Sequence, residues 1–185
     1  NDVKLKIIEK LESSNDFLPP VTIAVSLVKE QKWDLILQKT TELGVSEIIP
    51  LQLSRTLIKI DNNKSEKKYE RWMKICKEAS EQSRRTTIPK ILNIMKISDL
   101  IKLDYDLKIV CSTQEDATNL KQILSKYERC GKILVVIGPE GGITPEEEDL
   151  LILNGFEKTS LGNLILRVET APLFVMSVIN YELMR

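Results

Sequence analysis

The stretch Ile133-Leu134-Val135-Val136-Ile137-Gly138-Pro139-Glu140-Gly141-Gly142 decides the fold class. Its five leading apolar residues predict a strand buried on both faces, as in parallel sheets. The glycine segment 138–142 then predicts a loop at the carboxyl end of that strand. A second glycine segment, 161–171, follows the strand-like stretch 156–160. Because ligands of open α/β sheets bind outside the carboxyl ends of strands, the two loops predict one shared pocket.

Short apolar runs and helical patterns alternate along the rest of the chain. This alternation predicts an α/β domain with a mainly parallel sheet and helices on both faces. The pair Pro19-Pro20 marks a boundary that separates residues 1–18 from a main domain at 19–185. The expected strands are 22–28, 45–53, 107–111, 133–137 and 156–160, and the expected helices are 32–43, 65–85, 118–127, 145–153 and 171–184.

Charge is balanced overall but unevenly distributed. The chain of 185 residues has 27 Lys+Arg and 27 Asp+Glu, so its net charge is zero. Residues 29–90 hold 14 basic and 9 acidic side chains, whereas residues 137–185 hold 3 basic and 8 acidic ones. The first segment predicts a basic surface able to meet a phosphate backbone, although a solvated helix face explains the same pattern.

Composition also excludes several classes of site. The chain has no histidine, which removes the usual general base and the commonest metal ligand. Cys76, Cys111 and Cys130 are too widely spaced for a zinc site or a redox pair, so we expect no metal and reduced thiols in a cytoplasmic protein. No apolar stretch approaches the roughly 20 residues that span a bilayer, so no membrane partner is expected.

The first glycine loop leaves three interpretations open. Its glycines permit close approach of the backbone to a ligand, but a tight turn without a ligand fits equally well. A phosphate cradle is the weakest, because the spacing matches neither the dinucleotide fingerprint nor the P-loop with its lysine. Thr144, Pro145 and Glu147 just downstream predict a capping box, which needs no catalytic explanation.

The second glycine loop is unusually apolar. Leu161, Leu164, Ile165 and Leu166 stand where a polar loop is expected, and such a loop can wall an aromatic base while its backbone reads the base edge. Core packing is the competing explanation for the leucines. Arg167 and Glu169 follow at the entrance to the last helix, where an ion pair or a helix-dipole role would also explain Glu169.

Taken together, these segments resemble the RsmE family of ribosomal RNA (uridine-N3) methyltransferases, members of the SPOUT class. The resemblance runs from about Val21 to the C-terminus. Departures from the family pattern are Asn163, Leu164 and Val168, where proline, arginine and threonine are usual. The matching residues are Gln38-Lys39, Glu42 to Val45, Ile49 to Leu51, Ser54-Arg55, Trp72, Glu78-Ala79, Glu81 to Ser83, Arg85, Pro89 and the two glycine loops.

The resemblance implies a C-terminal deep trefoil knot and S-adenosylmethionine as cofactor. It also implies that residues 1–18 are the remnant of a PUA-like RNA-binding domain. The protein would be a homodimer, with the apolar side of helix 172–184 as a candidate dimer surface. The cofactor would lie between the two glycine loops and a third loop at 112–115, held by Ser112, Gly138, Pro139, Glu140, Gly141, Gly142, Leu161, Gly162, Ile165, Leu166, Thr170 and Ala171.

The implied substrate is 16S ribosomal RNA or the small ribosomal subunit. Since uracil N3 is a poor nucleophile while protonated, arginines aimed at O2 and O4 would stabilise the imide anion. Arg85, Arg167 and Glu169 are the expected catalytic residues, with Glu169 or a water as proton acceptor. Candidates for RNA binding are Arg55, Lys39, Gln82 and Arg84, with Lys29, Lys32 and Lys59 as further phosphate contacts.

Two rival functions remain open at the level of sequence. A knotted RNA-binding module that has lost catalysis would bind RNA but not the methyl donor. An unrelated nucleotide-binding α/β enzyme would bind a phosphorylated nucleotide, although no Walker lysine is present.

Overall fold

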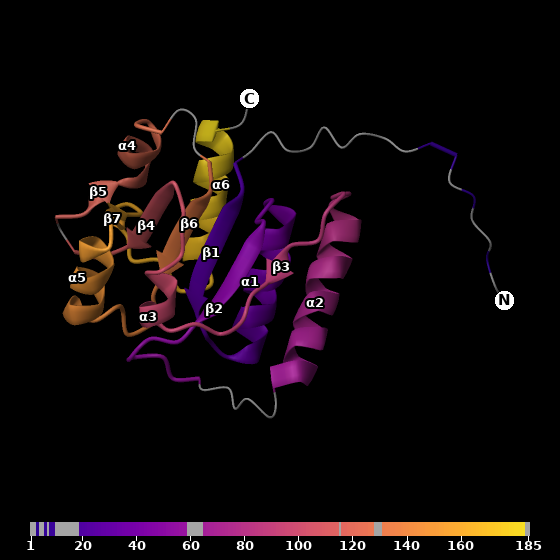
Figure 1. Ribbon diagram of the computed structural model, residues 1–185, viewed down its shortest axis with the longest axis horizontal. Coiled ribbons are helices and arrows are strands. Elements are labelled where there is room, and N and C mark those ends of the chain that lie inside the picture. The colour runs from indigo at the N-terminus through magenta and orange to yellow at the C-terminus, as the bar shows by residue number, and fades with distance from the viewer. Residues whose placement is uncertain are drawn as a thin grey trace.

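The described part of the chain contains thirteen elements, which form one α/β layer structure (Figure 1). The computed structural model describes residues 19–58, 65–114, 116–127 and 131–183, with the isolated positions 3, 6, 8 and 9. The N-terminal segment expected at residues 1–18 lies almost entirely outside these described residues. The elements are β1 (Val21–Ser26), α1 (Glu30–Glu42), β2 (Glu47–Leu51), α2 (Ser65–Gln82), β3 (Lys90–Ile91), α3 (Ile97–Leu100), β4 (Leu107–Cys111), β5 (Thr118–Asn119), α4 (Leu120–Leu124), β6 (Ile133–Ile137), α5 (Pro145–Leu153), β7 (Glu157–Ser160) and α6 (Ala171–Leu183).

The seven strands form one parallel sheet in the order β3-β2-β1-β6-β4-β7-β5. Its centre is β6, which pairs with β1 on one side and β4 on the other. Because all strands run the same way, their ends define a carboxyl edge and an amino edge. The carboxyl edge receives the loops that follow β4, β6 and β7, which are neighbours in the sheet.

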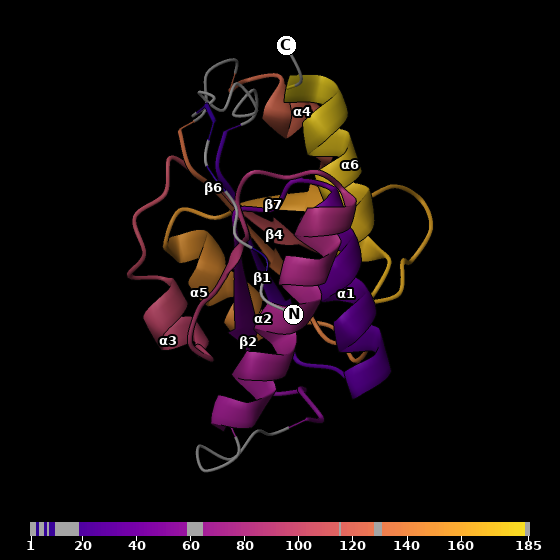
Figure 2. The same ribbon diagram turned by 90° about the vertical axis from the view of Figure 1, so that its right-hand side faces the viewer.

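Helices cover both faces of the sheet, as predicted (Figure 2). Alternate side chains of β6 show the arrangement: Ile133, Val135 and Ile137 enter one core, and Leu134 and Val136 enter the other. The first core also holds buried residues of α1, α2, α4 and α6, and the second holds those of α3 and α5. The central strands β1 and β6 are therefore buried on both faces, which explains why they are largely apolar, whereas the edge strands β3 and β5 are partly exposed.

The expected elements at 107–111, 133–137 and 145–153 are confirmed at both ends. The helix expected at 118–127 is wrong at its start, because Thr118–Asn119 pair with β7 as β5. The side chain of Asn119 then caps α4, its Oδ1 accepting from the backbone nitrogen of Lys121 at 2.9 Å. Strand β3 and helix α3 were not expected; two-residue strands and single-turn helices leave too short a pattern to detect.

Helix α2 ends at Gln82, three residues before the expected end. Arg84 has a φ of 58°, in the left-handed region. The backbone nitrogen of Arg85 donates to the carbonyl of Ser80 at 2.9 Å, and that of Arg84 to Glu81 at 3.3 Å. These two bonds form a Schellman motif, which normally places glycine where Arg84 stands. The helix therefore stops at a backbone geometry that an arginine adopts at a cost.

No helix within the described ranges is long and apolar enough to cross a membrane. Those residues also contain no cluster of histidine, cysteine or acidic side chains arranged for a metal ion.

Candidate active site

A cavity of about 800 Å³ opens at the carboxyl edge, among the loops after β4, β6 and β7. Both glycine loops line it, so the shared pocket predicted from the sequence exists. Of the twelve residues expected to hold the cofactor, eleven line the cavity. The exception is Thr170, whose backbone nitrogen donates to Arg167 at 2.8 Å in the turn that leads into α6.

The first glycine loop is a tight turn docked against α5. The backbone nitrogen of Gly142 donates to the carbonyl of Pro139 at 2.8 Å. A Cβ at Gly138 would lie 2.6 Å from Cγ1 of Ile143, so a side chain there would displace the loop. Downstream, Thr144 and Glu147 form the predicted capping box of α5.

The loop after β2 supports this turn from outside. The backbone nitrogen of Ser54 donates to Oε1 of Glu147 at 2.7 Å, and a guanidinium nitrogen of Arg55 donates to the carbonyl of Gly141 at 2.8 Å. Glu147 thus caps α5 and holds a neighbouring loop. Arg55, expected as an RNA contact, lines the cavity and fixes the backbone of its first glycine loop.

The second glycine loop has a buried base and an exposed tip. Gly162 has a φ of +117°, a conformation that side-chain-bearing residues rarely adopt. Leu161 and Leu166 pack against the first core, so core packing accounts for these two leucines. Leu164 and Ile165 are 80% and 84% exposed and line the mouth of the cavity.

The third wall follows β4. The backbone nitrogen of Ser112 donates to the carbonyl of Thr159 at 2.8 Å, and Ser112 Oγ accepts from the backbone nitrogen of Gln114 at 3.1 Å. Burial raises the pKa of the Cys111 thiol, which also lines the cavity, to about 12. The thiol is therefore protonated at neutral pH. Glu115, expected at the end of this loop, lies outside the described residues.

Lys32, at the start of α1, contacts both glycine loops. Its Nζ forms a short ion pair with Glu140 of the first loop and lies 3.3 Å from Oε2 of Glu169 at the end of the second. The bond to Glu140 raises the pKa of Lys32, and Lys32 in turn lowers the pKa of Glu140. Oε2 of Glu169 is buried, and its contact among the described residues is this ion pair with Lys32. Lys32 was expected to contact RNA phosphate. Its position in the sequence gave no indication that it pairs with Glu140 and Glu169.

A second ion pair stands at the side of the cavity. Glu148 of α5 lines it, and Nζ of Lys158 lies 2.9 Å from Oε1 of Glu148 and 2.6 Å from Asp116. That lysine lowers the pKa of Asp116. Helix capping accounts for Thr144, Pro145 and Glu147 at the start of α5, but no pattern in the sequence points to Glu148.

The other expected site residues lie at the amino edge, far from this cavity. Arg85 is half-buried and donates to the carbonyl of Thr41 at 2.7 Å and to that of Val45 at 2.9 Å. Burial lowers the pKa of Arg85. Lys32 and Thr41 both belong to α1, whose rise of about 1.5 Å per residue separates them by about 14 Å along the helix axis. Arg167 and Glu169 are thus gathered near the cavity, and Arg85 is not.

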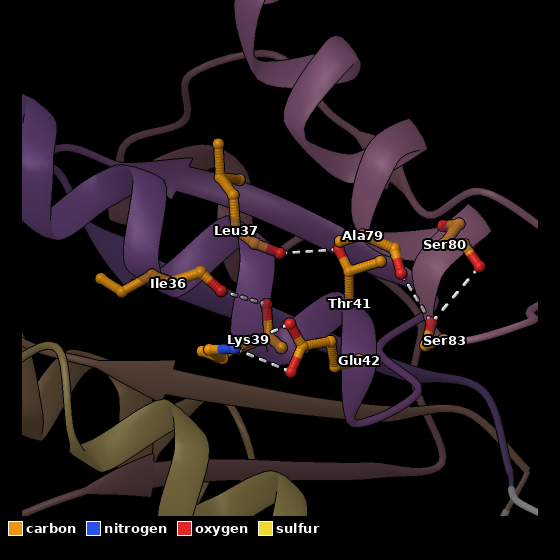
Figure 3. Close-up of polar contacts among 9 residues, drawn as sticks. Ile36, Leu37, Lys39, Thr41, Glu42, Ala79, Ser80 and Ser83 are labelled. Carbon is orange, nitrogen blue, oxygen red and sulfur yellow. Dashed lines mark hydrogen bonds and ion pairs between the residues drawn. The ribbon is translucent and has the colours of Figure 1, made fainter.

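Lys39 and Gln82 line a groove of about 1030 Å³ between α1 and α2. Nζ of Lys39 lies 2.8 and 3.0 Å from the two carboxylate oxygens of Glu42. Figure 3 shows this pair beside the end of α2, where Ser83 Oγ donates to the carbonyls of Ala79 and Ser80. The side chain of Arg84 is exposed.

Comparison with known proteins identifies the family. A model of the RNA methyltransferase domain family matches residues 16–180. The ribosomal RNA small subunit methyltransferase E of Bacillus subtilis is 38% identical over 97% of this chain and 73% of its own length. This chain belongs to the ribosomal RNA small subunit methyltransferase E family. The Synechocystis member is 34% identical over 95% of this chain and 57% of its own length, so part of each relative lies beyond the matched region.

Solved structures of the RsmE family agree with this architecture. The Neisseria gonorrhoeae member, solved with bound S-adenosylmethionine, has a TM-score of 0.81 at 32% identity, over 91% of this chain and 69% of its own. A tRNA-modifying TrmH/SpoU enzyme of A. aeolicus, at 13% identity and a TM-score of 0.51 over 88% of this chain and 74% of its own, shares the fold alone. The family resemblance read from the sequence is therefore confirmed, and this RsmE chain is a ribosomal RNA methyltransferase.

Proposed function

We propose that this chain transfers the methyl group of S-adenosylmethionine to N3 of one uridine in 16S ribosomal RNA. Family membership supplies the enzyme class. Two solved methyltransferases similar to this chain, from Legionella pneumophila and Neisseria gonorrhoeae, contain S-adenosylmethionine. The observation that carries the proposal is the cavity at the carboxyl edge, which gathers three loops from three neighbouring strands.

The cavity suits this cofactor in size and lining. Its volume of about 800 Å³ lies within the range of about 300–1,000 Å³ for ligand pockets. Ile137, Leu161 and Leu166 provide apolar walls for a base, and the glycine loops present backbone amides and carbonyls. Gly138 keeps the first loop close to that space, since a Cβ there would meet Ile143. We propose that the eleven lining residues predicted from the sequence hold the cofactor, with Thr170 acting through the turn before α6.

The chemistry proposed for the chain's own residues is electrostatic. S-adenosylmethionine supplies an electrophilic methyl group when bound, and the protein must hold the uracil in line and exclude water. Arg167 lines the cavity, and Arg55 has guanidinium donors beyond the one that holds Gly141. We propose that these two arginines stabilise the charge that develops on O2 and O4 as the N3 proton leaves.

Glu169 is the proposed proton acceptor. Its side chain is 14% exposed, and its buried Oε2 lies 3.3 Å from Nζ of Lys32. Glu169 does not itself line the cavity, so the proton would reach it through a water.

We propose that the protein acts as a homodimer. Phe174 and Tyr181 are exposed and stand seven residues apart on α6, which places them on one face of the helix. A second protomer would cover this apolar face. Catalysis by Arg85 would then take place in the pocket of the other protomer, and Arg84, Lys39 and Gln82 at the same edge would contact the RNA.

Three further proposals come from the resemblance. The first is that the C-terminal segment forms a deep trefoil knot. Residues 1–18 end a PUA-like domain that precedes the methyltransferase domain at 19–185. The protein works in the cytoplasm, where its ribosomal substrate is assembled. A crystal structure with a traced chain would test the first proposal, and imaging of the tagged protein the last.

The decisive experiment is mass spectrometry of nucleosides from 16S ribosomal RNA. Small subunits from a strain lacking this protein are incubated with the purified protein and S-adenosylmethionine, and the RNA is digested. We expect one new N3-methyluridine, distinguished by retention time from 5-methyluridine and 2′-O-methyluridine. Another isomer would overturn the N3 assignment. An RNA-binding module without catalysis would instead yield no methylated product and no heat on titration with S-adenosylmethionine.

A further inference from the structure

One ammonium group joins the two glycine loops. Lys32 lies in the first turn of α1, Glu140 in the loop after β6, and Glu169 at the end of the loop after β7. Its Nζ pairs with Glu140 Oε1 and lies 3.3 Å from Glu169 Oε2. The lysine side chain is 31% exposed and that of Glu169 is 14% exposed, so the pair with Glu169 is largely shielded from water.

The two loops differ in how firmly they are otherwise held. The first is anchored from outside by Arg55 on Gly141, with Glu147 binding Ser54 close by. The tip of the second has little packing: a Cβ at Gly162 would meet nothing within 4 Å, and Leu164 and Ile165 are mostly exposed. A link from the anchored loop to the base of the unpacked one would restrict how far the second loop moves.

Two other cations of the described residues, Lys29 and Arg167, lie near this link but do not make the same pair of contacts as Lys32. Lys29 and Arg167 also lower the pKa of Glu140 by their charge, less than Lys32 does. Neither forms an ion pair with Glu169 among the described residues. Lys32 is therefore the cation that contacts both loops, and it is already engaged by two carboxylates.

We infer that Lys32 is a positioning residue, which preorganises the two glycine loops for the methyl donor by binding Glu140 and Glu169 together. This inference rests on the proposed function for the identity of the ligand. It replaces the expectation that Lys32 contacts RNA phosphate. Holding a loop in its bound geometry improves affinity, because less ordering remains to be done on binding.

The central variant is Lys32→Met, which keeps the length of the side chain and removes its charge. In the protein without ligand, we expect faster amide hydrogen exchange at 161–168 and, more weakly, at 138–142. In calorimetric titration, we expect the dissociation constant for S-adenosylmethionine to rise by roughly 5- to 10-fold, the usual size of such coupling effects. Lys32→Arg should recover most of both properties.

A double-mutant cycle tests the contact itself. If Lys32 acts through Glu169, Lys32→Met combined with Glu169→Gln should weaken binding hardly more than either change alone. The matched control is Lys121→Met, which removes a lysine whose Nζ lies 3.5 Å from Glu182 and links α4 to α6 outside the cavity. That control should leave exchange in both loops and cofactor affinity unchanged.

The outcomes separate the two roles of Lys32. A phosphate contact predicts that Lys32→Met weakens RNA binding and reduces its salt slope by about one, while loop exchange and cofactor affinity stay at wild-type values. That result overturns the inference, as do fully additive effects in the cycle. If wild-type protein shows no heat with S-adenosylmethionine, the proposed function fails, and loop exchange still decides whether the link exists. If Lys32→Met does not fold, Glu140→Gln and Glu169→Gln provide the same test.

Discussion

The two edges of the sheet use arginine in opposite ways. At the carboxyl edge, Arg55 and Arg167 line a cavity, and Arg55 also holds the carbonyl of Gly141 in the loop that borders it. At the amino edge, both observed bonds of the Arg85 guanidinium go to backbone carbonyls, at Thr41 and Val45. Thr41 lies in the last turn of α1, where helical hydrogen bonds run out, and Val45 lies just beyond the helix. The same residue type therefore lines a cavity at one edge and closes the backbone at the other.

A family motif can identify the family without giving the position of each of its residues in the fold. Arg85 belongs to the segment Glu81 to Arg85, which matches the family pattern, and the resemblance implied a catalytic role for it. Within one protomer the structure places it beside α1 and β2. Four experiments test how far the two edges are separate, taken from the largest expected effect to the smallest.

Arg167→Met should have the largest effect, on the rate of methyl transfer. Removing one preorganised donor to a developing oxyanion typically costs about 100-fold in rate, so we expect a loss of that order with little change in unfolding free energy. Single-turnover assays with saturating RNA measure it. Arg71→Met is the control, because Arg71 pairs with Glu30 and Asp34 outside the cavity. A rate within twofold of wild type would remove Arg167 from the catalytic residues.

Arg85→Met should instead lower stability. It removes the charged donor from two carbonyls, and such bonds contribute up to about 1.5–3 kcal/mol each. Because Arg85 is half-buried and the carbonyl of Thr41 keeps its bond from the backbone nitrogen of Gly44, we expect a smaller total loss of about 2–3 kcal/mol in urea unfolding. Affinity for S-adenosylmethionine should be unchanged. If the rate of the folded variant also falls steeply, Arg85 acts in a second protomer's pocket. Mixing Arg85→Met with Arg167→Met would then restore part of the activity through mixed dimers.

Arg84→Gly should stabilise the protein by about 0.5–1 kcal/mol, because glycine adopts the left-handed geometry of this position without the penalty that arginine incurs. The matched variant Arg84→Ala keeps the penalty and removes the charge. Urea midpoints for both variants measure the effect. Equal losses of RNA affinity in the two variants would show that the arginine is retained for its side chain, and unchanged affinity would contradict RNA binding by Arg84.

Acid should weaken the Lys32–Glu140 pair at the carboxyl edge and leave the Arg85 contacts at the amino edge intact. This is the smallest of the four expected effects. The pKa of Glu140 lies below its ordinary value of 4.5 and that of Lys32 above its ordinary 10.5, so their pairing contributes fully between those values. It is lost as pH falls through the lowered pKa of Glu140, or as pH rises through the raised pKa of Lys32. Hydrogen exchange in loop 138–142, corrected for its intrinsic pH dependence, should be constant from pH 6 to 9 and increase toward pH 3. The carbonyl contacts of Arg85 have no acidic partner and should persist, and earlier loss there would contradict this assignment.

The fold was predictable because the central strands of the sheet are buried on both faces. A short continuous apolar run such as Ile133–Ile137 is typical of a strand buried on both faces of a sheet. The glycines that follow it mark the loop at the carboxyl edge. Short elements were not predicted because they have too few residues to show a pattern. Strand β5 has two residues, and its identity depends on the pairing of Thr118 with Thr159 across the sheet. Periodicity within a segment carries no information about such pairing.

The site was predictable where a residue's role is local to its loop. The glycine segments and the capping box of Thr144 depend on neighbouring residues, so the sequence pattern contains them. The contacts of Lys32 were not predictable because its partners, Glu140 and Glu169, lie more than a hundred residues away in the sequence. The contacts of Arg85 were not predictable either. Its partners are backbone carbonyls, which every residue has, so no side-chain pattern in the sequence marks them.

The exposed tip of the second glycine loop has a thermodynamic consequence. Leu164 and Ile165 hold apolar surface in water at the mouth of the cavity. A cofactor, a base or a partner protomer that covers them on binding removes this surface from water. The heat-capacity change of binding is then negative. Titrations at several temperatures should therefore show a binding enthalpy that becomes more favourable on warming, and Ile165→Ser should flatten that slope. Affinity at one temperature would not reveal which of the three ligands covers the tip, but the slope for each would.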